Sequence, residues 1–153
     1  MKINAKILSD KITPEMLQPK TPGSAGIDLM AVNFPDIAYL HSGECRKIGT
    51  GIAIHLGNPG YAAMVLPRSG LGTKGLVLAN TIGLIDSDYQ GEIILSVWNR
   101  SSDPIKINAM DRIAQLIIVP VIQPEFNFVE SFEQTERGIN GFGSTGINIL
   151  FKD

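Results

Sequence analysis

Most of the chain consists of short apolar runs that are rich in β-branched residues and end at turn-forming residues. Runs of this length and composition, bounded by Gly, Pro, Asn or Asp, predict β-strands. Residues 111–118 have a spacing that a helix could share, but their β-branched density and the Val-Pro that follows favour a strand ending at Pro120. The predicted strands cover residues 3–8, 26–32, 37–40, 46–56, 61–69, 75–85, 92–100, 105–122 and 125–132.

Helical periodicity is scarce. Only "TPEMLQ" (13–18) predicts a helical turn, with Thr13 as its cap and Pro14 in the first helical position. Eight or more strands at intervals of about 8–12 residues predict an all-β fold, either a sandwich, a jelly roll or a small barrel. From Glu133 onward the chain becomes polar and glycine-rich. We therefore expect a β domain over residues 1–132 and a C-terminal arm over residues 133–153, both within one single domain.

Composition narrows the range of functions. At 153 residues and 44% hydrophobic content, the chain can bury a core of its own. A net charge of −2 provides no basic face, so we expect neither nucleic acid nor a membrane as a partner. The single cysteine, Cys45, and the two histidines, His41 and His55, provide neither a disulfide nor a zinc signature. Cys45 is expected to be a small buried or half-exposed residue rather than a nucleophile. Without a signal-peptide core or a long apolar run, we expect a soluble, cytoplasmic protein.

Three further stretches carry candidate chemistry, and the first is the glycine-rich "GFGSTG" (141–146). It matches the dinucleotide fingerprint by letter, but too little chain follows it for the required helix and acidic residue. Its glycines and hydroxyls still suit a close approach to phosphate. Arg137 can grip a phosphate with two hydrogen bonds, and Phe142 can lie flat on a base. The alternative is an unstructured tail.

The second stretch, "LPRSGLGTKG" (66–75), joins Arg68, Ser69 and two glycines after an apolar strand. It is either an anion-binding turn or a plain surface turn with incidental charges. The third, "ANTIGLIDSDYQGEI" (79–93), holds Asp86 as a candidate general base and Tyr89 as a flat ring for a sugar. Asn80 can read the edge of a base, and Gln115 is an amide inside an apolar strand. Together these residue types are suited to hydrolysing a nucleotide anhydride.

In their order along the chain and in their residues, five segments resemble the five motifs of the trimeric dUTP nucleotidohydrolases, the dUTPases. They are "AGIDLMA" (25–31), "PRSGLG" (67–72), "NTIGLIDSDYQGEI" (80–93), "DRIAQLI" (111–117) and "RGINGFGSTG" (137–146). The resemblance spans nearly the whole chain. It implies a jelly-roll-like β domain, a homotrimer with three active sites between subunits, and a C-terminal arm that closes over each site.

The resemblance also implies roles for individual residues. Asp86 would activate the water that attacks the α-phosphorus of dUTP, and Tyr89 would pack against the deoxyribose and leave no room for a 2′-hydroxyl. The uracil edge would be bound by Asn80 and by the backbone of a hairpin that includes Gly83, Leu84, Ile85 and Ile94. The phosphates would be held by Arg68, Ser69, Gly70 and Gln115.

From the arm, the resemblance implies that Arg137 reaches the terminal phosphate and Phe142 covers the uracil, while Gly143 and Ser144 donate to phosphate. Mg²⁺ would be the cofactor, held mainly by the triphosphate and by water, because this ion gives up its water shell reluctantly. Asp28 would support the metal side through water.

The remaining acids and two departures from the family pattern complete the expectations. Asp88 and Glu92 are assigned to turn bonding and solvent-facing charge. The segment after "RSGLG" is one residue shorter than the family form, so Lys74 is given no role. The apolar end, residues 147–151, is expected to dock on a neighbouring subunit.

Two other functions remain open at this stage. One is deamination of dCTP by an enzyme of the same fold and trimeric assembly, and the other is a non-catalytic nucleotide-binding regulator. Release of ammonia rather than pyrophosphate would identify the first, and a lack of turnover would identify the second.

Overall fold

The computed structural model describes residues 1–32 and 34–140 of the chain. It divides into a compact unit, Met1–Gln123, and a second unit, Pro124–Asp153. Every helix and strand among the described residues belongs to the first unit. None of the helices in this described part is long and apolar enough to cross a membrane.

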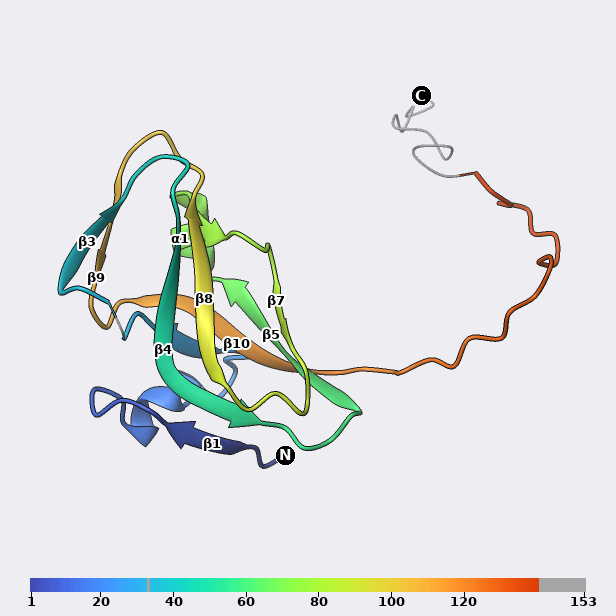
Figure 1. Ribbon diagram of the computed structural model, residues 1–153, viewed down its shortest axis with the longest axis horizontal. Helices are drawn as coiled ribbons and strands as arrows, with labels where there is room; N and C mark the ends of the chain where they lie inside the picture. Colours follow the sequence, from blue (N-terminus) through green and yellow to red (C-terminus); the bar gives the residue numbers. More distant parts are fainter. Residues whose placement is uncertain (33, 141–153) are drawn as a thin grey trace, which may run out of the picture. The chain divides into compact units, whose positions relative to one another are not determined.

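Two antiparallel four-stranded sheets form the first unit (Figure 1). The first sheet has the order β1 (Asn4–Ile7), β4 (Cys45–His55), β8 (Glu92–Asn99) and β6 (Leu76–Leu78). The second has the order β2 (Ile27–Met30), β10 (Arg112–Pro120), β5 (Tyr61–Pro67) and β7 (Gly83–Ile85). A separate two-stranded sheet pairs β3 (Ile37–Leu40) with β9 (Ile105–Asn108).

The hydrophobic core draws its buried side chains from both four-stranded sheets. Strand β8 shows the reason, because side chains on a strand alternate between its two faces. Ile93, Leu95 and Val97 are buried in the core, whereas Ile94 and Trp98, on the opposite face, are exposed. Burying each such aliphatic side chain stabilises the fold by about 1.5–3 kcal/mol. The predicted all-β architecture is therefore confirmed.

Nine strands had been predicted, and the eight that lie before residue 123 all contain strand in the structure. The runs 75–85 and 105–122 each divide into two strands. Thr81 and Met110, in the two connecting turns, have φ angles of 62° and 66°. A side-chain-bearing residue in this left-handed region interrupts a strand, and neither residue belongs to a type that favours the region. The strand predicted over residues 125–132 does not form, and no described strand pairs with this segment. A single strand without a partner cannot satisfy its backbone hydrogen bonds.

The helical prediction was partly right. Pro14–Leu17 forms a 3₁₀ turn, η1, with Thr13 in the cap position and Pro14 at its start, as predicted. A second helix, α1 (Ser69–Thr73), was missed because its sequence, "SGLGT", contains two glycines, which are poor helix formers. Cys45 was also misjudged. It lies exposed at the first position of β4, opposite Trp98.

A bulge interrupts the pairing of β4, which is the longest strand among the described residues. Pairing of β4 with β8 is regular from Cys45 to Gly49 and then resumes only at Ala53, opposite Glu92. Within the bulge, the Thr50 hydroxyl donates to the Ile93 carbonyl at 2.7 Å, and the Gly51 amide donates to Glu92 Oε1 at 2.8 Å. Beyond the bulge, β4 pairs with β1. The bulge thus lets one strand join β8 to β1.

Gly51 should tolerate no side chain. Its φ is +70°, and a Cβ there would lie 3.0 Å from Val32 Cγ1 and 3.1 Å from Ser9 Cβ. Gly43 is the matched control, because its φ is +76° and nothing lies within 4 Å of its Cβ position. We expect Gly43→Ala to cost about 1–2 kcal/mol of unfolding free energy from the backbone alone. Gly51→Ala should cost about 1–3 kcal/mol more from overpacking. Urea unfolding at one fixed protein concentration measures both, and equal losses would contradict the bulge packing.

Candidate active site

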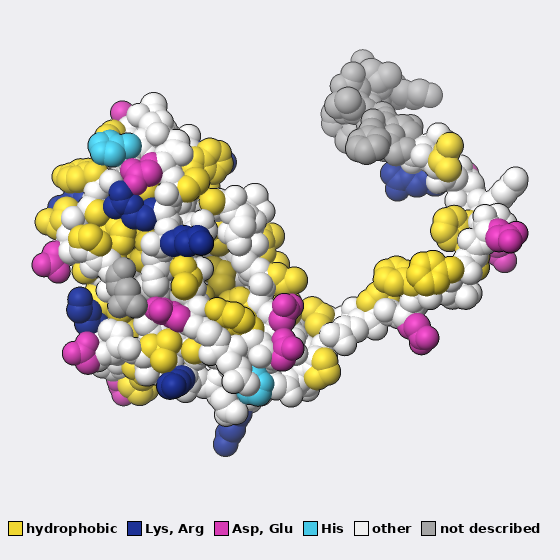
Figure 2. Space-filling model, in the orientation of Figure 1, with side chains coloured by type: hydrophobic (Ala, Val, Ile, Leu, Met, Phe, Trp, Pro, Cys, Tyr) yellow, Lys and Arg dark blue, Asp and Glu magenta, His cyan; other side chains and the backbone are white. Residues whose placement is uncertain are grey.

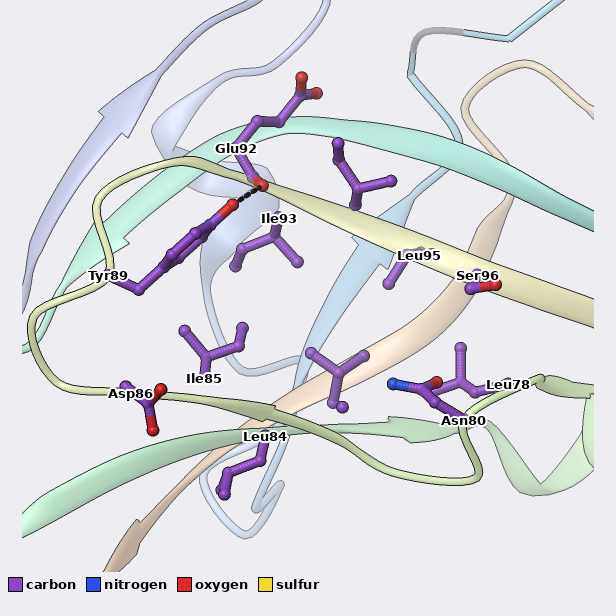
Figure 3. A pocket seen from close by; sticks show the side chains of 13 residues that line it. Leu78, Asn80, Leu84, Ile85, Asp86, Tyr89, Glu92, Ile93, Leu95 and Ser96 are labelled. Atoms are coloured by element: carbon purple, nitrogen blue, oxygen red, sulfur yellow. Dashed lines mark hydrogen bonds between the residues drawn. The ribbon is translucent and has the colours of Figure 1, made fainter.

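A hollow of about 230 Å³ opens between β7 and β8, which belong to different sheets (Figure 3). The resemblance implies a hairpin around this space, but β7 and β8 do not pair with each other. β7 pairs with β5, and β8 pairs with β4 and β6, so the two strands separate and leave space between them. Seven predicted site residues line this first hollow: Asn80, Gly83, Leu84, Ile85, Asp86, Tyr89 and Ile94.

The turn before β7 presents the amide of Asn80 to the first hollow. The backbone turns sharply here, with the Ile82 amide donating to the Asn80 carbonyl at 2.7 Å and Thr81 in the left-handed region. Gly83 follows directly, and a Cβ there would lie 3.3 Å from Val65 Cβ and 3.6 Å from Asn80 Nδ2. A glycine at position 83 therefore leaves open the space beside the amide.

The turn after β7 carries Asp86 and Tyr89 at the end of the hollow opposite Asn80 (Figure 3). The Tyr89 amide donates to the Asp86 carbonyl at 3.3 Å, and the Tyr89 hydroxyl donates to the Glu92 carbonyl at 3.0 Å. Asp86 is exposed, and the Tyr89 side chain is 44% exposed. The Asp86 carboxylate is therefore open to water, which a general base must contact.

The structure corrects the role expected for Glu92. It was assigned to solvent-facing charge, but its carboxylate accepts the Gly51 amide from the bulge of β4, 41 residues away in sequence. A single sequence gives no sign of this bond, because nothing near Glu92 indicates where the bulge will fall. The side chain therefore fastens the start of β8 to β4. Asp88 is exposed, as the turn assignment predicted.

A second hollow of about 740 Å³ collects the other predicted residues of the first unit. Asp28, Arg68, Ser69, Gly70 and Gln115 all line it, and it shares no lining residue with the first hollow. The helix α1 contributes Ser69 and Gly70 from its first turn, where backbone amides have no acceptor within the helix. These amides are available to an anion.

Asp28 holds two arginines at the edge of the second hollow. Its Oδ1 pairs with Arg68 Nε at 2.9 Å and its Oδ2 with Arg112 Nη1 at 3.3 Å. Arg68 Nη1 also donates to the Arg112 carbonyl at 3.0 Å. The Asp28 side chain is only 12% exposed, so these pairs are partly shielded from solvent. The observed partners of Asp28 are thus arginines.

A hydrogen bond and close packing hold the side-chain amide of Gln115 in place. Its Nε2 donates to the Pro67 carbonyl at 3.0 Å, and its Oε1 would lie 3.0 Å from a Cβ at Gly26. β10 places Gln115 directly opposite Asp28 of β2. The amide predicted from its polar character in an apolar strand therefore reaches the second hollow.

Four residues near the two hollows were missed from the sequence. Lys20 and Lys74 line the second hollow, Arg112 pairs with Asp28, and Gly91 lies against the Tyr89 ring. Arg112 stands inside the quoted "DRIAQLI", so its place in that motif was a usable signal. The shorter segment after "RSGLG" closes at Gly75, whose φ is +101° and whose Cβ position lies against Ser101. Lys74 ends α1 just before that turn.

The residues predicted in the C-terminal arm lie in the second unit or beyond the described residues. Arg137 begins a local turn in which the Asn140 amide donates to its carbonyl at 3.1 Å and its own Nε donates to the Asn140 carbonyl at 3.3 Å. Phe142, Gly143 and Ser144 lie outside the described residues.

The described residues contain no cluster of three or more His, Cys, Asp or Glu side chains suited to a metal ion. Asp28, the carboxylate that lines the second hollow, fits an ion that brings most of its own ligands, as Mg²⁺ bound to a polyphosphate does.

An all-β sandwich with a small hollow between its sheets and a separate hollow lined by more cations than acids is suited to binding a small anionic molecule. The family model described as dUTPase matches residues 13–146. Deoxyuridine 5′-triphosphate nucleotidohydrolases of Paraburkholderia xenovorans and Nitrosospira multiformis are 53% and 54% identical to the chain. In each comparison 95% of this chain is covered, with 99% and 97% of the respective relative. The chain belongs to the dUTPase family.

Solved structures agree with this assignment. A variant of the dUTPase of Staphylococcus bacteriophage 80alpha with dUpNHpp has a TM-score of 0.81 and 28% identity, covering 95% of this chain and 99% of that one. A variant of the dUTPase of phage phi11 of S. aureus, described with a structural Mg(II) ion, has a TM-score of 0.75 and 25% identity over 88% of this chain and 100% of that one. The jelly-roll-like fold implied by the motifs is confirmed.

Proposed function

We propose that the chain hydrolyses dUTP to dUMP and pyrophosphate, with Asp86 activating the water that attacks the α-phosphorus. Membership of the dUTPase family and relatives named for this reaction support the overall activity. The observation that carries the mechanism is the first hollow, which combines an amide, an aromatic ring and an exposed carboxylate in one small space. This enzyme limits uracil in DNA and supplies dUMP for dTMP synthesis.

Uracil recognition follows from the two ends of the first hollow. The Asn80 amide can donate and accept at once, which matches the adjacent carbonyl and N–H groups of uracil. Gly83, Leu84, Ile85 and Ile94 line the same space, and their backbone groups would bond the uracil edge. Cytosine reverses the donor and acceptor pattern, so it would leave polar groups without partners, and this costs more than a missing apolar contact. At the other end, the Tyr89 ring would pack against the deoxyribose.

The second hollow would bind the phosphates. Arg68, Ser69, Gly70 and Gln115 would contact the triphosphate. Lys20 and Lys74 also line this hollow and have no ion-pair partner among the described residues. With Asp28 the only acid lining the hollow, cations exceed acids there although the whole chain has a net charge of −2. A local excess of positive charge attracts a highly charged anion regardless of the net charge.

Mg²⁺ bound to the triphosphate would neutralise charge on the phosphate oxygens. The described protein residues fit such a substrate-borne ion, and Asp28 would reach it through water. In the structure Asp28 pairs with Arg68 and Arg112, so its direct contribution would be to orient Arg68 toward the phosphates.

The active enzyme would be a homotrimer whose sites combine the first hollow of one subunit with the second hollow of another. Support comes from the two hollows, which share no lining residue although one nucleotide must fill both. Apolar side chains along residues 122–132 also stand exposed (Figure 2), with Phe128 94% and Phe132 90% exposed. Apolar exposure of this extent marks a contact surface. Residues 133–153 would then act as an arm that brings Arg137, Phe142, Gly143 and Ser144 to a site.

The purified protein should release pyrophosphate from dUTP in the presence of Mg²⁺ and leave UTP, dTTP and dCTP largely unchanged. Parallel assays for pyrophosphate and for ammonia test this, because ammonia from dCTP would indicate the deaminase alternative. Comparable turnover of UTP would contradict the role of Tyr89 at the sugar.

Within the same assay, Asp86→Asn should slow hydrolysis by roughly 10²–10⁴-fold, the usual contribution of a positioned general base, while dUTP still binds. Asp88→Asn is the matched control from the same turn and should retain most of the activity. The reverse ranking would show that the roles of the two acids are exchanged.

Asp28→Asn should weaken phosphate binding without affecting the base. Loss of a charge-assisted hydrogen bond to Arg68 or Arg112 should raise the KM for dUTP about tenfold or more. Binding of deoxyuridine, which has no phosphate, should stay unchanged because the first hollow contains none of these residues. Asn80→Ala should show the opposite pattern, with loss of deoxyuridine binding. Calorimetry with deoxyuridine decides the matter, and equal weakening by both variants would contradict the separation of the two hollows.

Two inactive variants should restore activity when they assemble together. Arg68→Ala damages the second hollow and Asp86→Asn damages the first, so a trimer containing both has some sites built from two intact hollows. Random assortment of subunits should leave about a quarter of the sites intact. The measurement is dUTP turnover after joint refolding, with light scattering to establish the trimer. A mixed trimer without regained activity, or a monomeric protein, would contradict shared sites.

A further inference from the structure

The Tyr89 ring lies directly over Gly91 in the turn between β7 and β8. A Cβ added to Gly91 would overlap the Tyr89 hydroxyl oxygen and would lie 2.7 Å from Cζ and 3.2 Å from Cε2. The φ angle of Gly91 lies outside the left-handed region, so the backbone here does not itself require glycine. Glycine is needed here because it has no side chain, and the Tyr89 ring occupies the space that a side chain would fill.

The chain just after Gly91 is anchored. The Tyr89 hydroxyl donates to the Glu92 carbonyl at 3.0 Å, and the Glu92 carboxylate accepts the Gly51 amide of β4 at 2.8 Å. One residue further on, the Ile93 carbonyl accepts the buried Thr50 hydroxyl at 2.7 Å. The backbone after Gly91 is therefore fastened to the bulge of β4 and cannot easily move away from the ring.

A side chain at position 91 would consequently displace the ring rather than the backbone. Apolar atoms pack at about 3.5–4.0 Å, so a ring atom at 2.7 Å from the new Cβ would have to move by about 1 Å. The ring is 44% exposed, and Ile85 and Ile93 line the hollow on its inner side (Figure 3). The exposed side offers the least resistance, and movement in that direction takes the ring away from the hollow.

We propose that Gly91 is a positioning residue that sets the Tyr89 ring against the sugar and thereby determines discrimination between deoxyribose and ribose. The inference rests on the proposed dUTP hydrolysis and adds to it the residue that fixes the selective surface. Selection against a single hydroxyl group depends on a wall that is in place to a fraction of an ångström. A displacement of about 1 Å at a reacting site can cost about 10²-fold in rate.

A double-mutant cycle with Gly91→Ala and Tyr89→Ala tests whether Gly91 acts through Tyr89. The readouts are kcat and KM for dUTP and for UTP. Gly91→Ala alone should lower kcat/KM for dUTP by roughly 10–100-fold and bring the dUTP-to-UTP ratio close to that of Tyr89→Ala. When Tyr89 is already Ala, the same glycine substitution should change kcat/KM less than about twofold, because no ring remains to be displaced.

Gly23→Ala is the matched control, because no atom lies within 4 Å of the Cβ position of Gly23 and its φ is outside the left-handed region. It should leave kcat/KM and the nucleotide preference unchanged. Thermal unfolding of every variant separates loss of the fold from displacement of the ring. If Gly91→Ala alone fails to fold, the double variant should fold as Tyr89→Ala does, and an equally unfolded double variant would overturn the inference.

Two outcomes contradict the inference, and they differ from failure of the proposed function. Equal losses from Gly91→Ala with and without Tyr89 would show that Gly91 acts independently of the ring. An unchanged dUTP-to-UTP ratio in Gly91→Ala would show that the ring is not displaced from the sugar. In both cases the unsubstituted protein still hydrolyses dUTP, whereas failure of the proposed function would appear as no turnover in that protein.

Discussion

The bulge of β4 is the constraint on which the rest of the first hollow depends. Two bonds cross from it to the start of β8, one from the buried Thr50 hydroxyl and one from the Gly51 amide to Glu92. A bulge leaves backbone groups without their regular ladder partners, and a buried group without a partner costs about 1–3 kcal/mol. The carboxylate of Glu92 supplies that partner. The carbonyl of the same residue then accepts the Tyr89 hydroxyl, so a backbone irregularity next to the core fixes an aromatic ring at the surface.

The second hollow depends on one carboxylate shared by two arginines. Asp28 balances part of the charge of Arg68 and Arg112, which would otherwise repel each other at close range. The Asp28 carboxylate pairs with Nε of Arg68, and the Arg112 carbonyl accepts a hydrogen bond from Nη1 of Arg68. The Nη2 group of Arg68 therefore remains for a ligand. A guanidinium held at two of its three nitrogens has little rotational freedom left to lose when phosphate binds. If the second hollow binds phosphate as proposed, Asp28 would lower the entropic cost of binding even though its charge opposes the anion.

Much of this arrangement could be predicted from the sequence, and the failures have identifiable causes. The strand runs and the turn at Thr13 depend on local composition, which the sequence contains. The residues of the two hollows were recognised through motif order. The division of residues between two hollows was not foreseen, because β7 and β8 are adjacent in sequence yet pair in different sheets. Glu92 and Gly91 were missed because their partners are set by tertiary structure. Residues 125–132 have strand composition, but a strand needs a partner that local sequence does not supply.

The glycines show most clearly that a single sequence does not reveal what surrounds a residue in the fold. Gly43 has a left-handed backbone in open space, so it is there for conformation alone. Gly91 has an ordinary backbone and a ring against it, so it is there for space alone, and Gly51 combines both requirements. The three residues are the same letter in the sequence and differ only in what surrounds them. Because an aromatic ring near a substrate can be positioned by an absent side chain, the residues that shape a binding site include some with no group of their own to contact the ligand.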